Sequence, residues 1–107
     1  MTEPPLLHPS LTVAPSVVHG IGIHATTSIS PGKELGETHL DLRNRGGDLW
    51  RTGLGTFINN SNTPNCFKYG TITEHGTVYR LVTYERIEAG EELTVKYSLV
   101  ERAASDE

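Results

Sequence analysis

Short runs in which apolar and polar residues alternate, separated by glycine and proline, predict a chain built mostly of β-strands. The expected strands cover residues 11–14, 23–26, 38–42 and 93–97. Residues 67–73 and 77–87 form a predicted hairpin about the turn at 74–76, because Thr, Val, Tyr and Leu dominate its second arm, as strands prefer. The fold class that follows is mostly β and rich in turns.

The segments outside these strands are rich in glycine, proline or polar residues. Residues 1–10 hold three prolines and are expected to form a loosely ordered arm, and the polar residues 99–107 a frayed tail. Residues 43–55 hold four glycines and a lone Trp50, which predicts a loop or one short helical turn. A single domain, residues 11–98, is therefore expected between the arm and the tail.

One turn pattern occurs twice in the chain. The sequence Ile-x-x-Gly-x-Glu-Leu stands at residues 29–35 and again at residues 87–93. Each copy reads as a turn that enters a strand. Two explanations stay open: two copies of a common strand–turn–strand device, or an internal pseudo-repeat of the fold.

Length, charge and cysteine content narrow the classes of function. At 107 residues, of which 36% are hydrophobic, the chain is one domain with a small core. Its net charge of −4 argues against binding to nucleic-acid phosphates and is compatible with a basic peptide partner. The single Cys66 excludes an internal disulfide and a zinc-binding cysteine cluster, and the five histidines show no metal-ligand spacing. No apolar run reaches the roughly 18 residues of a membrane span, and no signal peptide is recognisable, so a cytoplasmic or otherwise intracellular location is expected.

Three motifs, in order along the chain, carry the candidate chemistry. Residues 18–25 read Val-His-Gly-Ile-Gly-Ile-His-Ala, residues 57–65 read Phe-Ile-Asn-Asn-Ser-Asn-Thr-Pro-Asn, and residues 90–97 read Gly-Glu-Glu-Leu-Thr-Val-Lys-Tyr. They resemble three signatures of the SET-domain lysine methyltransferases: Ile-His-Gly-x-Gly, Phe-Ile-Asn-His-Ser-Cys-x-Pro-Asn and Gly-Glu-Glu-Leu-Thr-x-x-Tyr. The resemblance covers residues 11–98 and implies a SET-domain β-clip of short curved sheets with a C-terminal pseudoknot.

The resemblance implies S-adenosyl-L-methionine as the cofactor. The residues that it assigns to cofactor binding are His19, Gly20, Ile21, Gly22, Asn59 and Asn60. Two missing Cβ atoms in the glycine motif would let a ligand approach the backbone, although a tight β turn is the alternative explanation. Asn59 matches the family, whereas Asn60 stands where the family has histidine. Asn62 replaces a frequent cysteine, and Thr56 a frequent arginine.

Tyr97 is the catalytic residue that the resemblance implies; the alternative is an ordinary strand-end aromatic residue. A lysine side chain, with a pKa of about 10.4, is protonated at neutral pH. A narrow, dry channel favours its neutral form, which can then accept a methyl group without help from a metal. Val95 and Lys68 are assigned to the substrate channel. Because Val95 stands where the family often has Phe or Tyr, di- or trimethylation is expected to be allowed.

The expected partner is a lysine-containing protein or peptide, histones included. Few residues follow Tyr97 to close the channel, so a homodimer that supplies the missing wall is expected. Two other functions remain open: a SET-like binding module that has lost methyl transfer, and a small β-clip ligand-binding domain without a cofactor. Hydrolysis by Glu91 and Glu92 is disfavoured, because adjacent strand residues face opposite sides.

Overall fold

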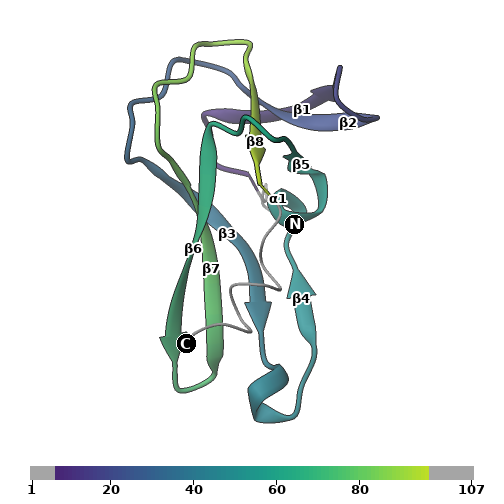
Figure 1. Ribbon diagram of the computed structural model, residues 1–107, viewed down its shortest axis with the longest axis vertical. Helices are drawn as coiled ribbons and strands as arrows, with labels where there is room; N and C mark the ends of the chain where they lie inside the picture. Colours follow the sequence, from purple (N-terminus) through teal and green to yellow (C-terminus); the bar gives the residue numbers. More distant parts are fainter. Residues whose placement is uncertain (1–6, 97–107) are drawn as a thin grey trace, which may run out of the picture.

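The computed structural model describes residues 7–96, which form two four-stranded sheets with strand orders β1-β2-β8-β5 and β4-β3-β7-β6. The strands are β1 (Leu11–Pro15), β2 (Ile21–Ala25), β3 (Glu34–Asp41), β4 (Leu49–Arg51), β5 (Asn59–Asn60), β6 (Cys66–Thr73), β7 (Gly76–Thr83) and β8 (Glu92–Val95). In Figure 1 the hairpin of β1 and β2 crosses the upper end of the molecule, while β3, β6 and β7 run along its length. The mostly β fold class is confirmed.

The first sheet brings distant parts of the chain together at β8. This strand lies between β2 and β5, antiparallel to β2 and parallel to β5. In the parallel pair Asn59 faces Thr94 and Asn60 faces Val95. The Asn-rich loop and the last strand, predicted as separate motifs, are therefore hydrogen-bonded neighbours.

The second sheet contains the predicted hairpin. Strands β6 and β7 pair in register from Cys66 opposite Thr83 to Thr73 opposite Gly76. Gly76 has a φ of 133°, a left-handed value that favours glycine at the tight turn. The prediction of a hairpin about residues 74–76 is confirmed, although its second arm ends at Thr83 instead of residue 87.

The prediction for residues 43–55 was incomplete. This segment holds a 3₁₀ turn (Arg43–Arg45), strand β4 and the start of the helix α1 (Gly53–Phe57). Three residues are too few for an alternating pattern to identify β4, which exists because it pairs with β3. The helix begins where the Oγ1 of Thr52 accepts a hydrogen bond from the amide of Gly55 at 3.1 Å, and its Leu54 is buried.

Each copy of the repeated turn is hydrogen-bonded to the end of the strand that precedes the other copy. The amide of Gly32 donates to the carbonyl of Thr83 at 2.7 Å, and the amide of Gly90 donates to the carbonyl of Ala25 at 2.8 Å. Both glycines have left-handed φ values, 78° and 90°. Because each copy makes the same contact with the strand that precedes the other, the structure favours the internal pseudo-repeat over two unrelated turns.

The core lies where the two sheets and α1 meet. Its buried side chains are Leu11, Ile23, Ala25, Ile29, Leu35, Leu54, Cys66, Leu81, Ile87, Leu93 and Val95. Leu7 and Ile58 pack against it. Burial raises the pKa of the Cys66 thiol to about 12, so this cysteine stays protonated and serves the core.

Candidate functional site

The turn that carries the glycine motif is shaped by contacts within the chain. Gly20 has a φ of 50°, and a Cβ placed on it would meet nothing within 4 Å. Gly22 is buried, and a Cβ there would collide with the carboxylate of Glu92 and lie 3.0 Å from Nδ2 of Asn59. Gly22 therefore makes room for Glu92 and Asn59, whereas Gly20 leaves the outer side of the turn open to approach.

Asn59 fastens this turn to the first sheet. Its Nδ2 group donates to the carbonyl oxygens of His19 and Ile21, at 3.1 and 3.2 Å. The same nitrogen lies 2.9 Å from a carboxylate oxygen of Glu92 and 3.1 Å from Oγ of Ser16. Asn59 thus positions the glycine turn through its side chain, a role more specific than a loop-capping amide.

Ser16 and Glu92 complete the base of the turn. The sequence analysis did not name Ser16, and it named Glu92 only as part of a motif and of a disfavoured hydrolytic pair. The Ser16 hydroxyl lies 2.8 and 2.9 Å from the two carboxylate oxygens of Glu92 and donates to that group. Its oxygen accepts the amides of Val18 at 2.8 Å and His19 at 3.1 Å. A serine hydroxyl often accepts the backbone amides two and three residues after it in a turn. A serine at this distance before the glycine motif is therefore the sequence signal that could have identified the turn.

The end of the Asn-rich loop holds β8 in place. Asn65 donates from Nδ2 to the carbonyl of Glu92 at 3.0 Å and accepts the amide of Thr94 at 2.9 Å. The hydroxyl of Tyr84 donates to the carbonyl of Pro64. The side chain of Asn65 acts as a short strand partner along β8, which explains an asparagine at this point of the motif.

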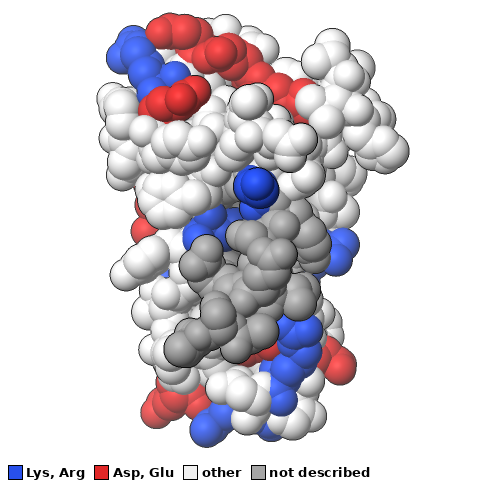
Figure 2. Space-filling model, viewed as in Figure 1, with Lys and Arg blue, Asp and Glu red and all other residues white. Residues whose placement is uncertain are grey.

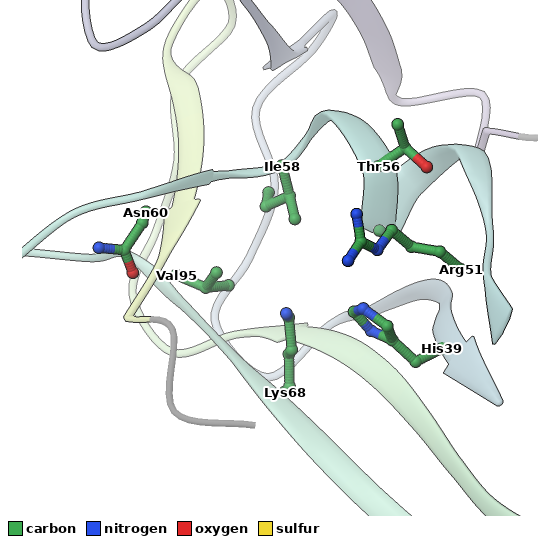
Figure 3. Close-up of a pocket in the computed structure, with 8 residues that line it drawn as sticks. His39, Arg51, Thr56, Ile58, Asn60, Lys68 and Val95 are labelled. Carbon is green, nitrogen blue, oxygen red and sulfur yellow. The ribbon is translucent and has the colours of Figure 1, made fainter. Parts of the chain in front are cut away.

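A cavity of about 200 Å³ opens on the other side of β5 and β8 (Figure 3). Its lining comes from strands, α1 and the residue after α1: His39, Arg51, Gly55, Thr56, Ile58, Asn60, Lys68 and Val95. Asn60, Lys68 and Val95, predicted as cofactor or channel residues, are therefore brought together in one place. His39 and Arg51 were not predicted there, since only the pairing of β3 with β4 and β7 carries them to it.

Basic side chains are among the described residues that line the cavity. Burial, followed by the charge of Arg51, lowers the pKa of Lys68 to about 8. Burial also lowers the pKa of His39 to about 4; Lys68 and Arg51 act in the same direction and Asp41 opposes them. At pH 7 the Lys68 amine is thus mostly protonated and the His39 ring neutral. On the face shown in Figure 2, basic side chains lie at mid-height as well as at the lower end, while acidic ones gather toward both ends.

Two consecutive residues of β5 connect the glycine turn with the cavity. Asn59 holds the glycine turn, and the next residue, Asn60, lines the cavity. The predicted catalytic Tyr97, the predicted pseudoknot and the frayed tail lie outside the described residues. Glu91 accepts the amide of Glu88 at 2.6 Å, while Glu92 faces Ser16, so the two carboxylates do not form a hydrolytic pair.

Within residues 7–96, no three His, Cys, Asp or Glu side chains are grouped as a metal would need. No helix in this range is both long and apolar enough to cross a membrane.

The motifs, the paired sheets and the glycine turn agree with a family match. The SET domain family model matches residues 36–98, more than half of the chain. The chain belongs to the SET domain family. The matched part of this SET domain runs from β3 past β8 and contains the cavity, β5 and the Asn-rich loop.

Solved SET-domain structures share the fold. A putative histone methyltransferase of Plasmodium falciparum matches with a TM-score of 0.66 and 17% identity, over 82% of this chain and 92% of that protein. The Polycomb Repressive Complex 2 of Chaetomium thermophilum bound to GSK126 matches with a TM-score of 0.68 and 18% identity, over 89% of this chain and 18% of that one. The same complex in an autoinhibited apo state matches with a TM-score of 0.68 and 18% identity, over 91% of this SET domain and 17% of that chain. No curated protein matches the chain by sequence. At such identities the structural matches establish the fold alone.

Proposed function

We propose that this SET domain is an S-adenosyl-L-methionine-dependent protein-lysine N-methyltransferase. The observation that carries the proposal is the juxtaposition on β5: Asn59 holds the glycine turn expected to bind the cofactor, and Asn60 lines the cavity expected to take the substrate. A methyl donor and a methyl acceptor must meet in line, which requires that their two sites open into each other.

The glycine turn fits a bound cofactor. Gly20 leaves its outer side clear, and the side chains of Val18 and Ile21 are each 49% exposed beside it. The carbonyls of His19 and Ile21 are fixed in direction by Asn59, so the turn is pre-formed. The bound cofactor would supply an activated methyl group; His19, Gly20, Ile21, Gly22, Asn59 and Asn60 would hold it.

The cavity fits the chemistry of a lysine acceptor. A lysine becomes a nucleophile when it loses its proton, and burial favours that loss. Lys68 supports this expectation, because the same surroundings lower its own pKa to about 8. Tyr97, two residues beyond the cavity-lining Val95, remains the residue proposed to position the reacting amine.

Calorimetric titration with S-adenosyl-L-methionine, followed by radiolabelled methyl transfer to histones and to a cell lysate, tests the proposal. Saturable binding and label on lysine are expected. Absence of cofactor binding would contradict the methyltransferase assignment and leave the β-clip ligand-binding domain as the alternative.

A non-catalytic SET module is the second candidate, and one observation favours it. The cavity already holds the cationic side chains of Lys68 and Arg51, which oppose the entry of a protonated lysine. Cofactor binding without transfer to any protein would select this candidate.

The proposal includes a protein or peptide substrate inside the cell, without a nucleic-acid or membrane partner, and a homodimer. The dimer is supported by β6, which among the described strands is one of the two edge strands of its sheet. Its side chains Phe67, Tyr69 and Ile72 are exposed by 41%, 58% and 81%. An exposed apolar edge is a surface on which a second copy can pair. Light scattering at tens of micromolar is expected to give twice the monomer mass; a monomer with full activity would exclude the dimer.

A further inference from the structure

His39 forms part of the cavity wall and is almost fully buried. It lies on β3, is 2% exposed and lines the cavity of about 200 Å³. Its ring packs edge-on against the ring of Tyr79, with centroids 6.5 Å apart and planes at 88°. Figure 3 shows the ring of His39 directed into the same space as the side chain of Lys68. A polar ring packed in this way presents a fixed chemical group to a side chain that enters the cavity.

A neighbouring hydroxyl holds one nitrogen of this ring. The Nδ1 atom of His39 lies 3.0 Å from Oγ1 of Thr38, whose side chain is fully buried. The Thr38 hydroxyl has a single hydrogen, which it donates to the carbonyl of Tyr79 at 3.3 Å. Its oxygen then accepts the hydrogen of Nδ1. Because a neutral imidazole carries its hydrogen on one nitrogen only, this arrangement leaves a lone pair on Nε2, which points away from Thr38.

The charges near the ring favour the same tautomer. Burial, followed by the charges of Lys68 and Arg51, lowers the pKa of His39 to about 4, while Asp41 opposes them. The ring is therefore neutral at pH 7. Nearby cations attract a lone pair on Nε2, whereas they repel the hydrogen of an N–H group at that position. The cavity wall thus contains a hydrogen-bond acceptor as well as basic side chains.

We propose that Nε2 of His39 accepts a hydrogen bond from the side-chain nitrogen of the substrate lysine, and so determines which methylation states the cavity binds. This inference rests on the proposed methyl transfer, because it assigns the cavity to the acceptor lysine. In their protonated forms lysine, monomethyl-lysine and dimethyl-lysine each carry at least one N–H, whereas trimethyl-lysine carries none. The first three can donate to His39. A third methyl group removes the bond and favours departure of the product.

The bond positions the lysine nitrogen and transfers no proton. The pKa of His39, about 4, lies far below the ordinary lysine value of about 10.4, so the ring is too weak a base to take the proton. The proton that lysine must lose before it accepts a methyl group goes to water instead. A hydrogen bond from a charged donor is shorter and stronger than one between neutral groups, so His39 holds the nitrogen in place as it enters.

The first test locates the ring hydrogen of His39 in the intact chain, without cofactor. Long-range nuclear magnetic resonance spectra of the isotope-labelled protein show which imidazole nitrogen carries the hydrogen, and the signals lost in His39→Phe assign this residue. At pH 7 we expect a hydrogen on Nδ1 and a lone pair on Nε2. A hydrogen on Nε2 would overturn the proposal, because no acceptor would then face the lysine.

A matched pair of capped peptides tests recognition of the N–H group. One is Ala-Lys-Ala, and the other carries trimethyl-lysine at the same position, so the two have the same charge and differ in their hydrogen-bond donors. A saturable shift of the Nε2 signal of His39 is expected with the lysine peptide, and a much smaller one with the trimethyl-lysine peptide. Equal shifts with both peptides, or no shift with either, would contradict the proposal.

Kinetics of two variants connect the bond with turnover. His39→Phe keeps an aromatic ring against Tyr79 but lacks the acceptor. We expect KM for the lysine peptide to rise at least about tenfold, the scale of one hydrogen bond to a charged group, while kcat and cofactor affinity change little. Thr38→Val removes the hydroxyl that holds Nδ1 and should raise KM through the loss of the fixed tautomer. Thr83→Val is the matched control: Thr83 is equally buried and donates to the carbonyl of Ser30 at 2.7 Å, outside the cavity, so KM should not change.

The outcomes separate this inference from the proposed function. Methyl transfer with an unchanged KM in His39→Phe would exclude His39 from substrate binding and leave the methyltransferase assignment intact. A shift of Nε2 with the lysine peptide, without transfer to any protein, would support lysine recognition by His39 and select the non-catalytic module instead.

Discussion

Ile29 and Ile87 form an isolated antiparallel bridge between the two copies of the repeated turn. The amide of Ile29 donates to the carbonyl of Ile87 at 2.8 Å, and the amide of Ile87 donates back at 3.0 Å. Both side chains are almost fully buried. The two copies of the repeated turn therefore meet at their first residues, and each copy leads into a strand of a different sheet. The bridge couples the sheet that carries the glycine turn to the sheet that carries Lys68.

Replacement of Tyr97 by phenylalanine tests the catalytic assignment. We expect methyl transfer to slow by at least ~100-fold, the scale for loss of one stabilising donor. Cofactor affinity should stay nearly unchanged, because the proposed cofactor contacts lie at the glycine turn and β5. Single-turnover kinetics beside calorimetry would measure both quantities. Near wild-type transfer in Tyr97→Phe would remove this residue from the mechanism.

Replacement of Asn59 by alanine should act through the cofactor turn. The carbonyls of His19 and Ile21 lose their donor, so the turn loosens and cofactor binding weakens by roughly 1–3 kcal/mol. The transfer rate at saturating cofactor should fall much less. Asn62→Ala, in the exposed part of the same loop, is the control and should bind normally. Unchanged affinity in Asn59→Ala would separate the turn from the cofactor.

The side chain of Val95 should set the number of methyl groups transferred. Val95 is 2% exposed and lines the cavity of about 200 Å³, where a small residue leaves space for a methylated amine. Wild type is expected to give di- or trimethyl-lysine, and Val95→Phe mainly monomethyl-lysine. Mass spectrometry at long times and excess cofactor measures the products. Monomethyl-lysine as the only product of the wild type would contradict the expectation.

The half-buried side chain of Lys68 should make the free energy of unfolding depend on pH in the alkaline range. Folding lowers its pKa from 10.5 to about 8, so at intermediate pH the unfolded chain binds more protons than the folded one. Stability should therefore rise as pH increases from about 8 to 10.5, with the cost of the buried charge fully present below that window. Lys68→Met should be the more stable protein at pH 7 and should lose this part of the pH dependence. Urea unfolding at several pH values compares the two. If the free energy of unfolding depends on pH equally in both proteins, folding does not lower the pKa of Lys68.

The sequence identified those parts of the molecule that rest on local patterns. The β6–β7 hairpin follows from alternating strand formers on either side of a glycine turn, and the repeated turn is visible as a repeated string. Strand β4 could not be found in this way, because three residues carry no period and its pairing partner, β3, precedes it by a 3₁₀ turn.

Of the candidate site, only the residues named from the motifs and their surroundings could be predicted from the sequence. Asn60, Lys68 and Val95 were named from motifs, and the structure places them around one cavity. Arg51 and His39 belong to no motif and reach the cavity only through sheet pairing. The bond from Asn59 to the glycine turn joins residues about forty positions apart, and no local pattern encodes such a distance.

The parallel pairing of β5 with β8 has a consequence for biosynthesis. Residues 59–60 are synthesised before residues 92–95. Strand β5 therefore gains its strand partner only when β8 pairs between β2 and β5. Glu92 and Val95, one at each proposed subsite, arrive with that same late strand. A nascent chain with β8 still inside the ribosomal tunnel therefore lacks one residue of each subsite. Completion of both subsites depends on the same long-range pairing, and long-range strand pairing is slow.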